Sequence, residues 1–209
     1  MAKNTVLAVG AHPDDLEFGC GGLLYLLSQR GWRVHLLVMT GGEHGGLPAV
    51  RVSEQERSAV LLKARLHWGG FRDTEIHTDT NLIKTIDRHV AEIEPRLLLT
   101  HYWDDSHQDH RAVSQAVITA GRYVRNLLFY EGPSTFNFMP STYVDIGQVI
   151  KQKLKLLQLH ASQVHKTRVP HLSILESAKS VAIYRGHQNK SKYAEALQPL
   201  RLSFNDFFL

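Results

Sequence analysis

Hydrophobic residues along the chain fall into short uninterrupted runs that alternate with longer segments of helical spacing. An uninterrupted run of five or six residues is typical of a strand buried on both faces, as in a parallel sheet. Residues 5–9 and 34–39 are such runs. Residues 16–30, between them, repeat leucine with a helical period and end at Gly31, a favourable helix stop. This strand–helix–strand unit predicts parallel pairing with a right-handed crossover.

The same alternation continues to the C-terminal part of the chain. Further helices are predicted over residues 53–66, 81–94, 111–124, 147–163 and 172–186, and further strands over residues 96–101, 126–130 and 143–146. Ser53 is the predicted N-cap of the first of these helices. The pattern predicts an α/β fold with an open, mostly parallel sheet and helices on both faces.

Composition limits the class of protein further. The 209 residues, 43% of them hydrophobic, predict a single domain over residues 1–209. The 24 basic and 20 acidic residues are interspersed, and the densest basic cluster, KQKLK at 151–155, is interpreted as a solvated helix face, so no nucleic-acid partner is expected. The single cysteine, Cys20, predicts a reducing compartment. No apolar run approaches about 18 residues and no signal peptide is recognised, which predicts a cytoplasmic protein without a membrane partner.

Candidate chemistry lies at the ends of two predicted strands. AHPDD (11–15) follows the first strand and DDSHQDHR (104–111) follows the strand at 96–101. Ligands of open parallel sheets bind beyond the carboxyl ends of the strands, so the two segments face one another across a crevice if these strands are neighbours. Pro13 suits the first helical position and the two aspartates suit the positive end of a helix dipole. A well-formed helix start does not, however, explain His12.

His12 and Asp15, three residues apart across a tight turn, can converge on one point while Asp14 points elsewhere. His107 and His110 have the same spacing in the second segment. Together the segments offer a set of two histidines and one carboxylate: His12, Asp15 and His110. Three protein ligands with one open position are typical of catalytic zinc. Asp14, Asp109 and His107 remain for proton transfer and for supporting the ligands.

These motifs resemble those of the LmbE-like (PIG-L) superfamily of zinc-dependent N-acetylglucosamine de-N-acetylases. The resemblance lies in AHPDD, followed by Glu17 and GCGG, and in the later HQDH. The segments GGEHGG, RVSE, LQLHASQ and RGHQNKSKYAEAL are similar to family segments as well. The family often has proline where this chain has Gln108, and the helix after Arg51 lacks the usual leucine-glycine ending and reads RLHWGG.

The resemblance implies a Rossmann-like fold in which the metal, Zn²⁺ or another divalent ion such as Fe²⁺, is bound by His12, Asp15 and His110. It implies that Asp14 is the general base and that a protonated His107, oriented and kept charged by Asp109, stabilises the oxyanion. Protonation of the leaving amine by Asp14 or by His107 stays open.

Further implications of the resemblance concern the substrate and assembly. Arg51 is expected to hold a substrate hydroxyl or phosphate, with Glu54 fixing its guanidinium group. The expected substrate is a small-molecule sugar, and a homo-oligomer is expected.

The predicted function is removal of the N-acetyl group from an N-acetylglucosamine-type sugar or its conjugate. The alternative is an amidase with the same chemistry that acts on a thiol-sugar conjugate or an acylated antibiotic intermediate. A nucleotide-binding module is disfavoured, because GAHPDD lacks G-x-G-x-x-G and its aspartates would repel a pyrophosphate. A metal-binding but inactive protein would not need Asp14 and His107. The other histidines without an evident partner are interpreted as structural: His35, His67, His77 and His89.

Overall fold

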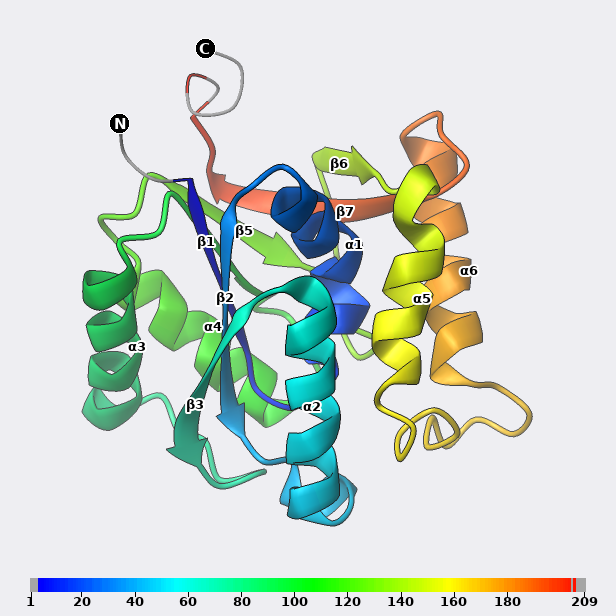
Figure 1. The fold of residues 1–209 in the computed structure, drawn as a ribbon. Coiled ribbons are helices and arrows are strands. Elements are labelled where there is room, and N and C mark those ends of the chain that lie inside the picture. The colour runs from blue at the N-terminus through cyan, green and yellow to red at the C-terminus, as the bar shows by residue number, and fades with distance from the viewer. Residues whose placement is uncertain (1–3, 204, 206–209) are drawn as a thin grey trace.

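The computed structural model describes residues 4–203 and 205, and within them one seven-stranded sheet has the order β3-β2-β1-β4-β5-β7-β6 (Figure 1). The strands are β1 (Thr5–Gly10), β2 (Arg33–Thr40), β3 (Arg65–Phe71), β4 (Leu97–His101), β5 (Asn126–Tyr130), β6 (Thr142–Asp145) and β7 (Ala194–Arg201). Strands β1 to β5 pair in parallel, whereas β7 runs antiparallel to β5 and β6. The predicted open, mostly parallel α/β sheet is confirmed.

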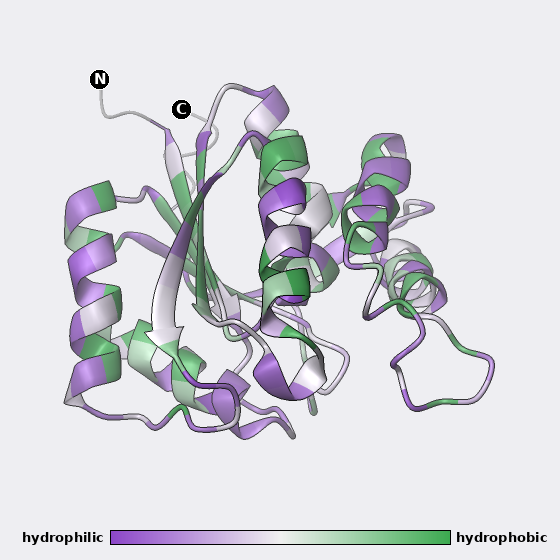
Figure 2. Cartoon of the chain, turned by 60° about the horizontal axis from the view of Figure 1, so that its bottom comes forward, coloured by the Kyte–Doolittle hydropathy of each residue, from purple (hydrophilic) through white to green (hydrophobic). Residues whose placement is uncertain are grey.

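Helices cover both faces of this sheet (Figure 1). They are α1 (Asp15–Gln29), α2 (Pro48–Leu62), α3 (Thr80–Ile93), α4 (Gln108–Ala120), α5 (Ile150–Gln158) and α6 (Ile174–Gln188), with 3₁₀ turns η1 (Glu43–Gly45) and η2 (Gly147–Val149). Ile86 of α3 and Val117 of α4 belong to the buried cluster on one face, and Leu24 of α1 and Leu156 of α5 to the cluster on the other. In Figure 2 the hydrophobic residues of α3 lie toward the sheet. The sheet is therefore buried on both faces.

The order of the strands creates the predicted crevice. β1 pairs with β2 on one side and with β4 on the other, both in parallel. From β1 the chain first adds β2 and then β3 on one side of β1. It then adds β4 and β5 on the other side, so the boundary between β1 and β4 is the topological switch point. The segments after β1 and β4 therefore meet at the carboxyl edge of the sheet, where open α/β folds bind ligands.

Helix α1 begins one residue before the predicted range 16–30 but two residues after Pro13. Its first helical residue is Asp15, and Asp14 is the N-cap in a left-handed conformation (φ 87°, ψ −21°). The prediction of Pro13 at the first helical position is therefore wrong. Further along, Cys20 has non-helical angles (φ −142°, ψ 17°), which kinks the helix. The carboxylate of Glu195 accepts the N–H groups of Gly22 and Leu23 just after this kink at 2.8 and 2.7 Å.

Several other boundaries differ from the predictions. Helix α2 begins at Pro48 after the N-cap Leu47, so Ser53 lies inside the helix and is not its cap. RLHWGG, predicted as the end of that helix, lies in the edge strand β3. Strand β7 is not predicted from the sequence, because its segment AEALQPLR mixes polar residues and a proline with its apolar ones and forms no apolar run. Helix α4 begins at Gln108, three residues before the predicted start at 111.

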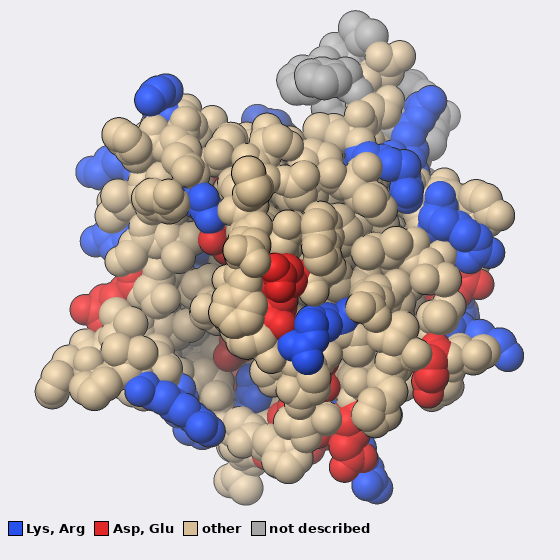
Figure 3. All heavy atoms as spheres, turned by 180° about the vertical axis from the view of Figure 1, so that it is seen from behind, with Lys and Arg blue, Asp and Glu red and all other residues tan. Residues whose placement is uncertain are grey.

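The charged surface agrees with the mixed composition. In Figure 3, basic and acidic side chains lie both around the edge and near the middle of one face, and the two signs are interspersed. Among the helices that the structure describes, none is both long enough and apolar enough to span a bilayer. The prediction of a single domain over residues 1–209 stays a prediction.

Candidate metal centre

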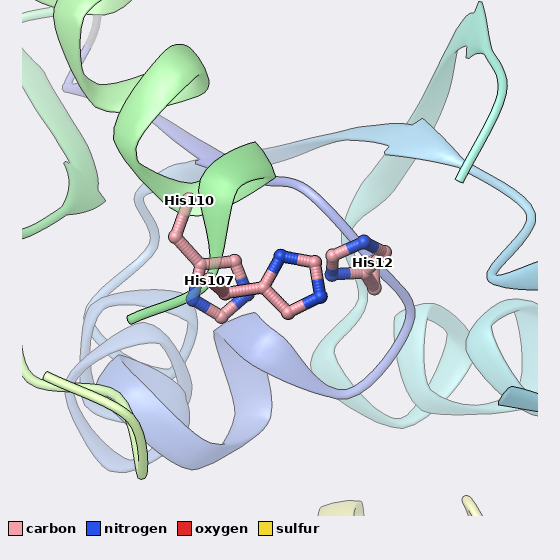
Figure 4. Close-up of side chains that lie close together, drawn as sticks. All are labelled: His12, His107 and His110. Carbon is pink, nitrogen blue, oxygen red and sulfur yellow. The ribbon is translucent and has the colours of Figure 1, made fainter. Parts of the chain in front are cut away.

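The two motifs meet where β1 and β4 end. His12 follows β1 and Asp15 opens α1, whereas His107 and His110 lie at the start of α4. The ring centroid of His107 lies 4.7 Å from that of His12 and 4.6 Å from that of His110. Figure 4 shows the three imidazoles gathered between the N-terminus of α4 and the loop after β1. The two motifs are far apart in the sequence, and the pairing of β1 with β4 brings them together in space.

The carboxylate of Asp15 lies between two of these histidines. Its Oδ2 is 3.4 Å from Nδ1 of His12, and its Oδ1 is 3.4 Å from Nε2 of His110. These separations are close to those between two ligands of one tetrahedral ion with bonds of about 2.0–2.1 Å. All three side chains are buried: His12 is 7%, Asp15 8% and His110 4% exposed. Each of the two histidines is therefore close enough to share an ion with Asp15, although the ligand atoms of His12, Asp15 and His110 do not all lie within 4.8 Å of one another.

The neighbouring side chains provide overlapping donor sets. In residues 4–203 and 205, the groups whose ligand atoms all lie within 4.8 Å of one another are His12 with His107 and His110; His12 with Asp73, His107 and Asp109; and Asp15 with His101 and His110. The predicted set shares two members with the first group and two with the third. His101 is the residue that the sequence reasoning did not consider.

His101 forms a wall of the centre. Its ring stacks on that of His110 at a centroid distance of 3.9 Å, and its Nε2 lies 3.2 Å from Oδ2 of Asp15. That same Nε2 accepts the backbone N–H of Ala11 at 3.1 Å, which occupies its lone pair. Burial lowers the pKa of His101 to about 4, so the ring is neutral. His12 and His110 are therefore better placed than His101 to bind an ion together with Asp15.

Outer carboxylates orient both histidines. Asp105, 2% exposed, has its Oδ1 3.3 Å from Nδ1 of His110. Oδ1 of Asp73 and Oδ2 of Asp109 each lie 3.0 Å from Nε2 of His12. A carboxylate on the second ring nitrogen fixes the tautomer of a metal-binding histidine and raises its basicity. The nitrogens that face Asp15 are then Nδ1 of His12 and Nε2 of His110.

The electrostatics of the centre follow from these contacts. Burial opposes ionisation of Asp15, but the charge of His110 outweighs it and holds the pKa of Asp15 well below its ordinary value. Burial likewise lowers the pKa of His110, and the carboxylates of Asp15 and Asp105 overcome this effect and raise it to about 9. The centre therefore holds a buried negative charge that attracts cations, here protons on the imidazoles.

Asp14 points away from this donor set. Its Oδ2 lies 3.5 Å from Nη2 of Arg51, and its backbone N–H donates to Oε1 of Gln55 at 3.2 Å. Burial raises the pKa of Asp14 to about 6, although Arg51 opposes the shift. The expected divergence of the two adjacent aspartates is thus present, and its origin is the left-handed backbone of Asp14.

His107 differs from the expectation in its partner. Its Nδ1 accepts the backbone N–H of Asp109 at 3.3 Å, while the carboxylate of Asp109 contacts His12 and accepts the N–H of Thr74 at 2.7 Å. The prediction that this carboxylate orients His107 and keeps it charged is therefore wrong. Burial, with His110 and His12, lowers the pKa of His107. Because Nδ1 is an acceptor here, the neutral ring carries its proton on Nε2.

Arg51 is 5% exposed and holds two loops together. Its Nη1 donates to the carbonyl of Gly42 at 2.9 Å and its Nη2 to that of Pro13 at 2.7 Å. The expected pairing with Glu54 is wrong, because that carboxylate accepts the N–H and hydroxyl of Ser162 at 2.8 and 2.7 Å. Whether Arg51 also contacts a substrate stays a prediction.

Sequence reasoning missed the residues that complete the centre: Asp73, His101, Asp105 and Gln55. His101 and Asp105 lie within or beside the segment that was singled out, and their position after a buried strand was a usable signal. Asp73 follows β3, which was not predicted. His35, His67 and His89, interpreted as structural, contact one another across the sequence: Nδ1 of His35 lies 3.1 Å from Nε2 of His67, and the ring of His67 lies 5.3 Å from that of His89.

Comparison with known proteins identifies relatives of this chain. A family model described as GlcNAc-PI de-N-acetylase (PIG-L) matches residues 7–121, the part of the chain that contains both motifs. The chain is 34% identical over 175 residues to the uncharacterized deacetylase YaiS of Escherichia coli (strain K12), covering 79% of this chain and 92% of that protein. It is 27% identical over 229 aligned residues to the diacetylchitobiose deacetylase of Thermococcus kodakarensis, covering 92% and 82%.

Among solved structures, the conserved protein TT1542 of Thermus thermophilus superposes with a TM-score of 0.86 at 26% identity, covering 98% of both chains. TT1542 thus shares the fold over nearly the whole chain.

Proposed function

The chain belongs to the PIG-L family of GlcNAc-PI de-N-acetylases, and from this membership we propose that it hydrolyses the N-acetyl group of an N-acetylglucosamine-type sugar or its conjugate. The observation that carries the proposal is the position of the Asp15 carboxylate, 3.4 Å from a nitrogen of His12 and 3.4 Å from one of His110. A related protein is named diacetylchitobiose deacetylase, which supports a sugar substrate.

We propose that His12, Asp15 and His110 hold the metal, Zn²⁺ in the first instance, with Fe²⁺ as the alternative for the same donors. When bound, such an ion acts as a Lewis acid on a carbonyl oxygen and makes water more acidic. The outer carboxylates Asp105 and Asp73 keep the lone pairs of the two imidazoles directed at the ion. Burial of the three donors excludes competing water from their other sides.

Asp14 is the proposed general base. It is the next residue to the ligand Asp15, yet its carboxylate lies outside the donor set, beside Arg51. A carboxylate in this position takes a proton from the attacking water, and a pKa of about 6 suits a base that works near neutral pH. The proton then returns to the leaving amine, from Asp14 or through His107.

His107 is the proposed hydrogen-bond donor to the oxyanion. Its Nδ1 accepts an N–H, so its Nε2–H is available to the substrate without protonation of the ring. A donor of this kind contributes about 3–4 kcal/mol in the transition state. The proposed role of Asp109 changes accordingly, from orienting His107 by its carboxylate to orienting His12. The contact of Arg51 with a substrate hydroxyl or phosphate remains part of the proposal.

The test combines metal analysis with amine release. Wild type, Asp14→Asn and Asp15→Asn are loaded with Zn²⁺ or Fe²⁺ and assayed on N-acetylglucosamine, diacetylchitobiose, anionic and thiol-bearing N-acetylglucosamine conjugates, and an N-acylated antibiotic aglycone. We expect about one ion per chain in wild type and Asp14→Asn, a loss of metal in Asp15→Asn, and full activity only in wild type. Asn at position 14 is expected to lower kcat by about 10²–10⁴-fold.

Two outcomes contradict parts of the proposal. Loss of metal from Asp14→Asn would mean that the roles of the two aspartates are exchanged. Metal-loaded wild type that releases no amine from any of these substrates would overturn the de-N-acetylase assignment.

A further inference from the structure

Among residues 11–14, which connect β1 to α1, Asp14 is the one with a positive φ. With φ 87° and a β-carbon, Asp14 occupies the left-handed region that residues other than glycine rarely adopt. This conformation separates two consecutive carboxylates: Asp15 enters the donor set, and Asp14 faces helix α2. Such backbone strain persists only where surrounding contacts enforce it. The question is which contacts do so here.

One face of α2 supplies them. Arg51, Gln55 and Ser58 are spaced by four and three residues, so they lie on the same side of the helix, and all three are buried. Arg51 donates to the carbonyl of Pro13 at 2.7 Å. Gln55 accepts the N–H of Asp14 at 3.2 Å. Both contacts are made to the Pro13–Asp14 peptide group, so α2 holds the peptide that immediately precedes the Cα of the strained residue.

The amide of Gln55 has a fixed orientation. Its Nε2 donates to Oε1 of the fully buried Glu17 at 2.7 Å, and a carboxylate oxygen accepts hydrogen bonds rather than donating them. The amide nitrogen must therefore face Glu17, and the amide oxygen must face Asp14. Ser58 donates its hydroxyl to the same Oε1 of Glu17 at 2.6 Å. Gln55 and Ser58 thus both donate to Glu17. Of the two, Gln55 also accepts the N–H of Asp14.

We propose that Gln55 is a positioning residue for the reaction. Its side-chain oxygen holds the N–H of Asp14 in the left-handed turn and so keeps the Asp14 carboxylate outside the metal's donor set, while Glu17 holds the Gln55 amide in the required orientation. This inference rests on the proposed function, in which Asp14 takes the proton. It assigns to α2 a catalytic task that neither sequence motif contains.

The direct test is hydrogen exchange of the Asp14 backbone amide in the zinc-loaded protein, measured by NMR. Gln55→Met preserves the side-chain length but removes both polar contacts. We expect exchange at Asp14 to accelerate by about tenfold in Gln55→Met, as expected for the loss of one hydrogen bond. Exchange should be unchanged in Ser58→Ala, the matched control that also removes a donor to Glu17. Leu24, fully buried in α1, is the reference amide.

The kinetic test uses the same variants. We expect Gln55→Met to lower kcat by about 10- to 100-fold, with KM within about twofold of wild type and about one zinc ion still bound per chain. In the background of Asp14→Asn, Gln55→Met should lower kcat no further, because both changes act through the same carboxylate. A purely structural role would produce additive losses.

The outcomes separate the two proposals. Equal acceleration of exchange at Asp14 and Leu24, unchanged exchange at Asp14, or additive kinetic effects would each overturn the role of Gln55. If wild type releases no amine, the de-N-acetylase assignment fails, and the exchange measurement alone decides whether Gln55 holds the Asp14 turn.

Discussion

Oδ1 of Asp105 lies 3.3 Å from Nδ1 of His110, while Nε2 on the other side of the same ring faces Asp15. The imidazole therefore lies between the carboxylate of Asp105, which orients it, and the carboxylate of Asp15, with which it is proposed to bind the same metal ion. Asp105 is itself fixed, because its two oxygens accept the hydroxyls of Ser134 and Thr135 at 2.7 and 3.0 Å. We therefore expect Asp105 to influence the affinity of the centre for a metal ion.

Asp105→Asn should lower the affinity for Zn²⁺ by about 10- to 100-fold, because an amide cannot support the basicity of His110 as a carboxylate does. Competition with a chromophoric chelator measures the affinity. Asp104→Asn is the matched control, since Asp104 accepts from Asn137 and lies outside the donor sets. Equal affinity in the two variants would contradict the orienting role.

Metal removal should lower the stability of the folded protein. The donors are preformed and buried, so an ion that binds only the folded state adds about 2.7 kcal/mol at a free concentration 100 times its Kd. For a chain of 209 residues this corresponds to a fall in Tm of about 5–10 °C on chelation. Scanning calorimetry with and without a chelator measures the difference. His12→Ala should show little change on chelation, and an equal fall in that variant would place the stabilising ion elsewhere.

The pair His35 and His67 should make stability depend on pH. Burial, followed by His67 and Arg65, lowers the pKa of His35 to about 4 in the folded state, whereas an unfolded histidine titrates near 6.5. Between these values the unfolded chain binds more protons, so stability rises with pH there and is lost as the pH falls below about 6.5. The loss attributable to His35 at pH 5.5 is roughly 1 kcal/mol.

Urea unfolding of the metal-free protein at pH 7.5 and pH 5.5 tests this expectation. His35→Gln should reduce the difference in unfolding free energy between the two pH values. His77→Gln, at an exposed position, should leave it as in wild type. A wild-type pH dependence in His35→Gln would contradict the assignment.

Lys153 and Glu195 form a buried ion pair behind the kink of α1, with 2% and 4% exposure. The Lys153 ammonium also donates to the carbonyls of Glu17 and Phe18. Lys153→Met should destabilise the fold by about 3–5 kcal/mol, because it leaves the Glu195 carboxylate buried without a countercharge. Urea unfolding measures the change, with the exposed Lys151→Met as control.

The double variant Lys153→Met with Glu195→Gln should recover part of this loss, because the uncompensated charge is then absent. The Glu195→Gln change alone has its own cost in unfolding free energy. If the double variant is less stable than Lys153→Met by that full cost, the two residues act independently.

The amino-acid sequence determined the parts of this protein that depend on neighbouring residues. Apolar runs gave β1, β2, β4 and β5 nearly to the residue, and the three-residue spacing of His12 and Asp15 across a strand-to-helix turn was sufficient to bring their side chains together. Strands β3 and β7 escaped prediction because their glycines, proline and polar residues lack a distinct local period. Tertiary contacts, not local preference, make those segments strands.

Only the tertiary structure decided which side chains complete the centre. Asp73 reaches His12 because β3 pairs with β2, and Gln55 reaches Asp14 because α2 packs beside the start of α1. Likewise, the carboxylate of Asp109 contacts a histidine 97 positions away rather than its neighbour in the motif. Ligand spacing is local and can be read along a chain. The partners that orient those ligands come from other elements, and their pairing is fixed only when the sheet and its helices pack.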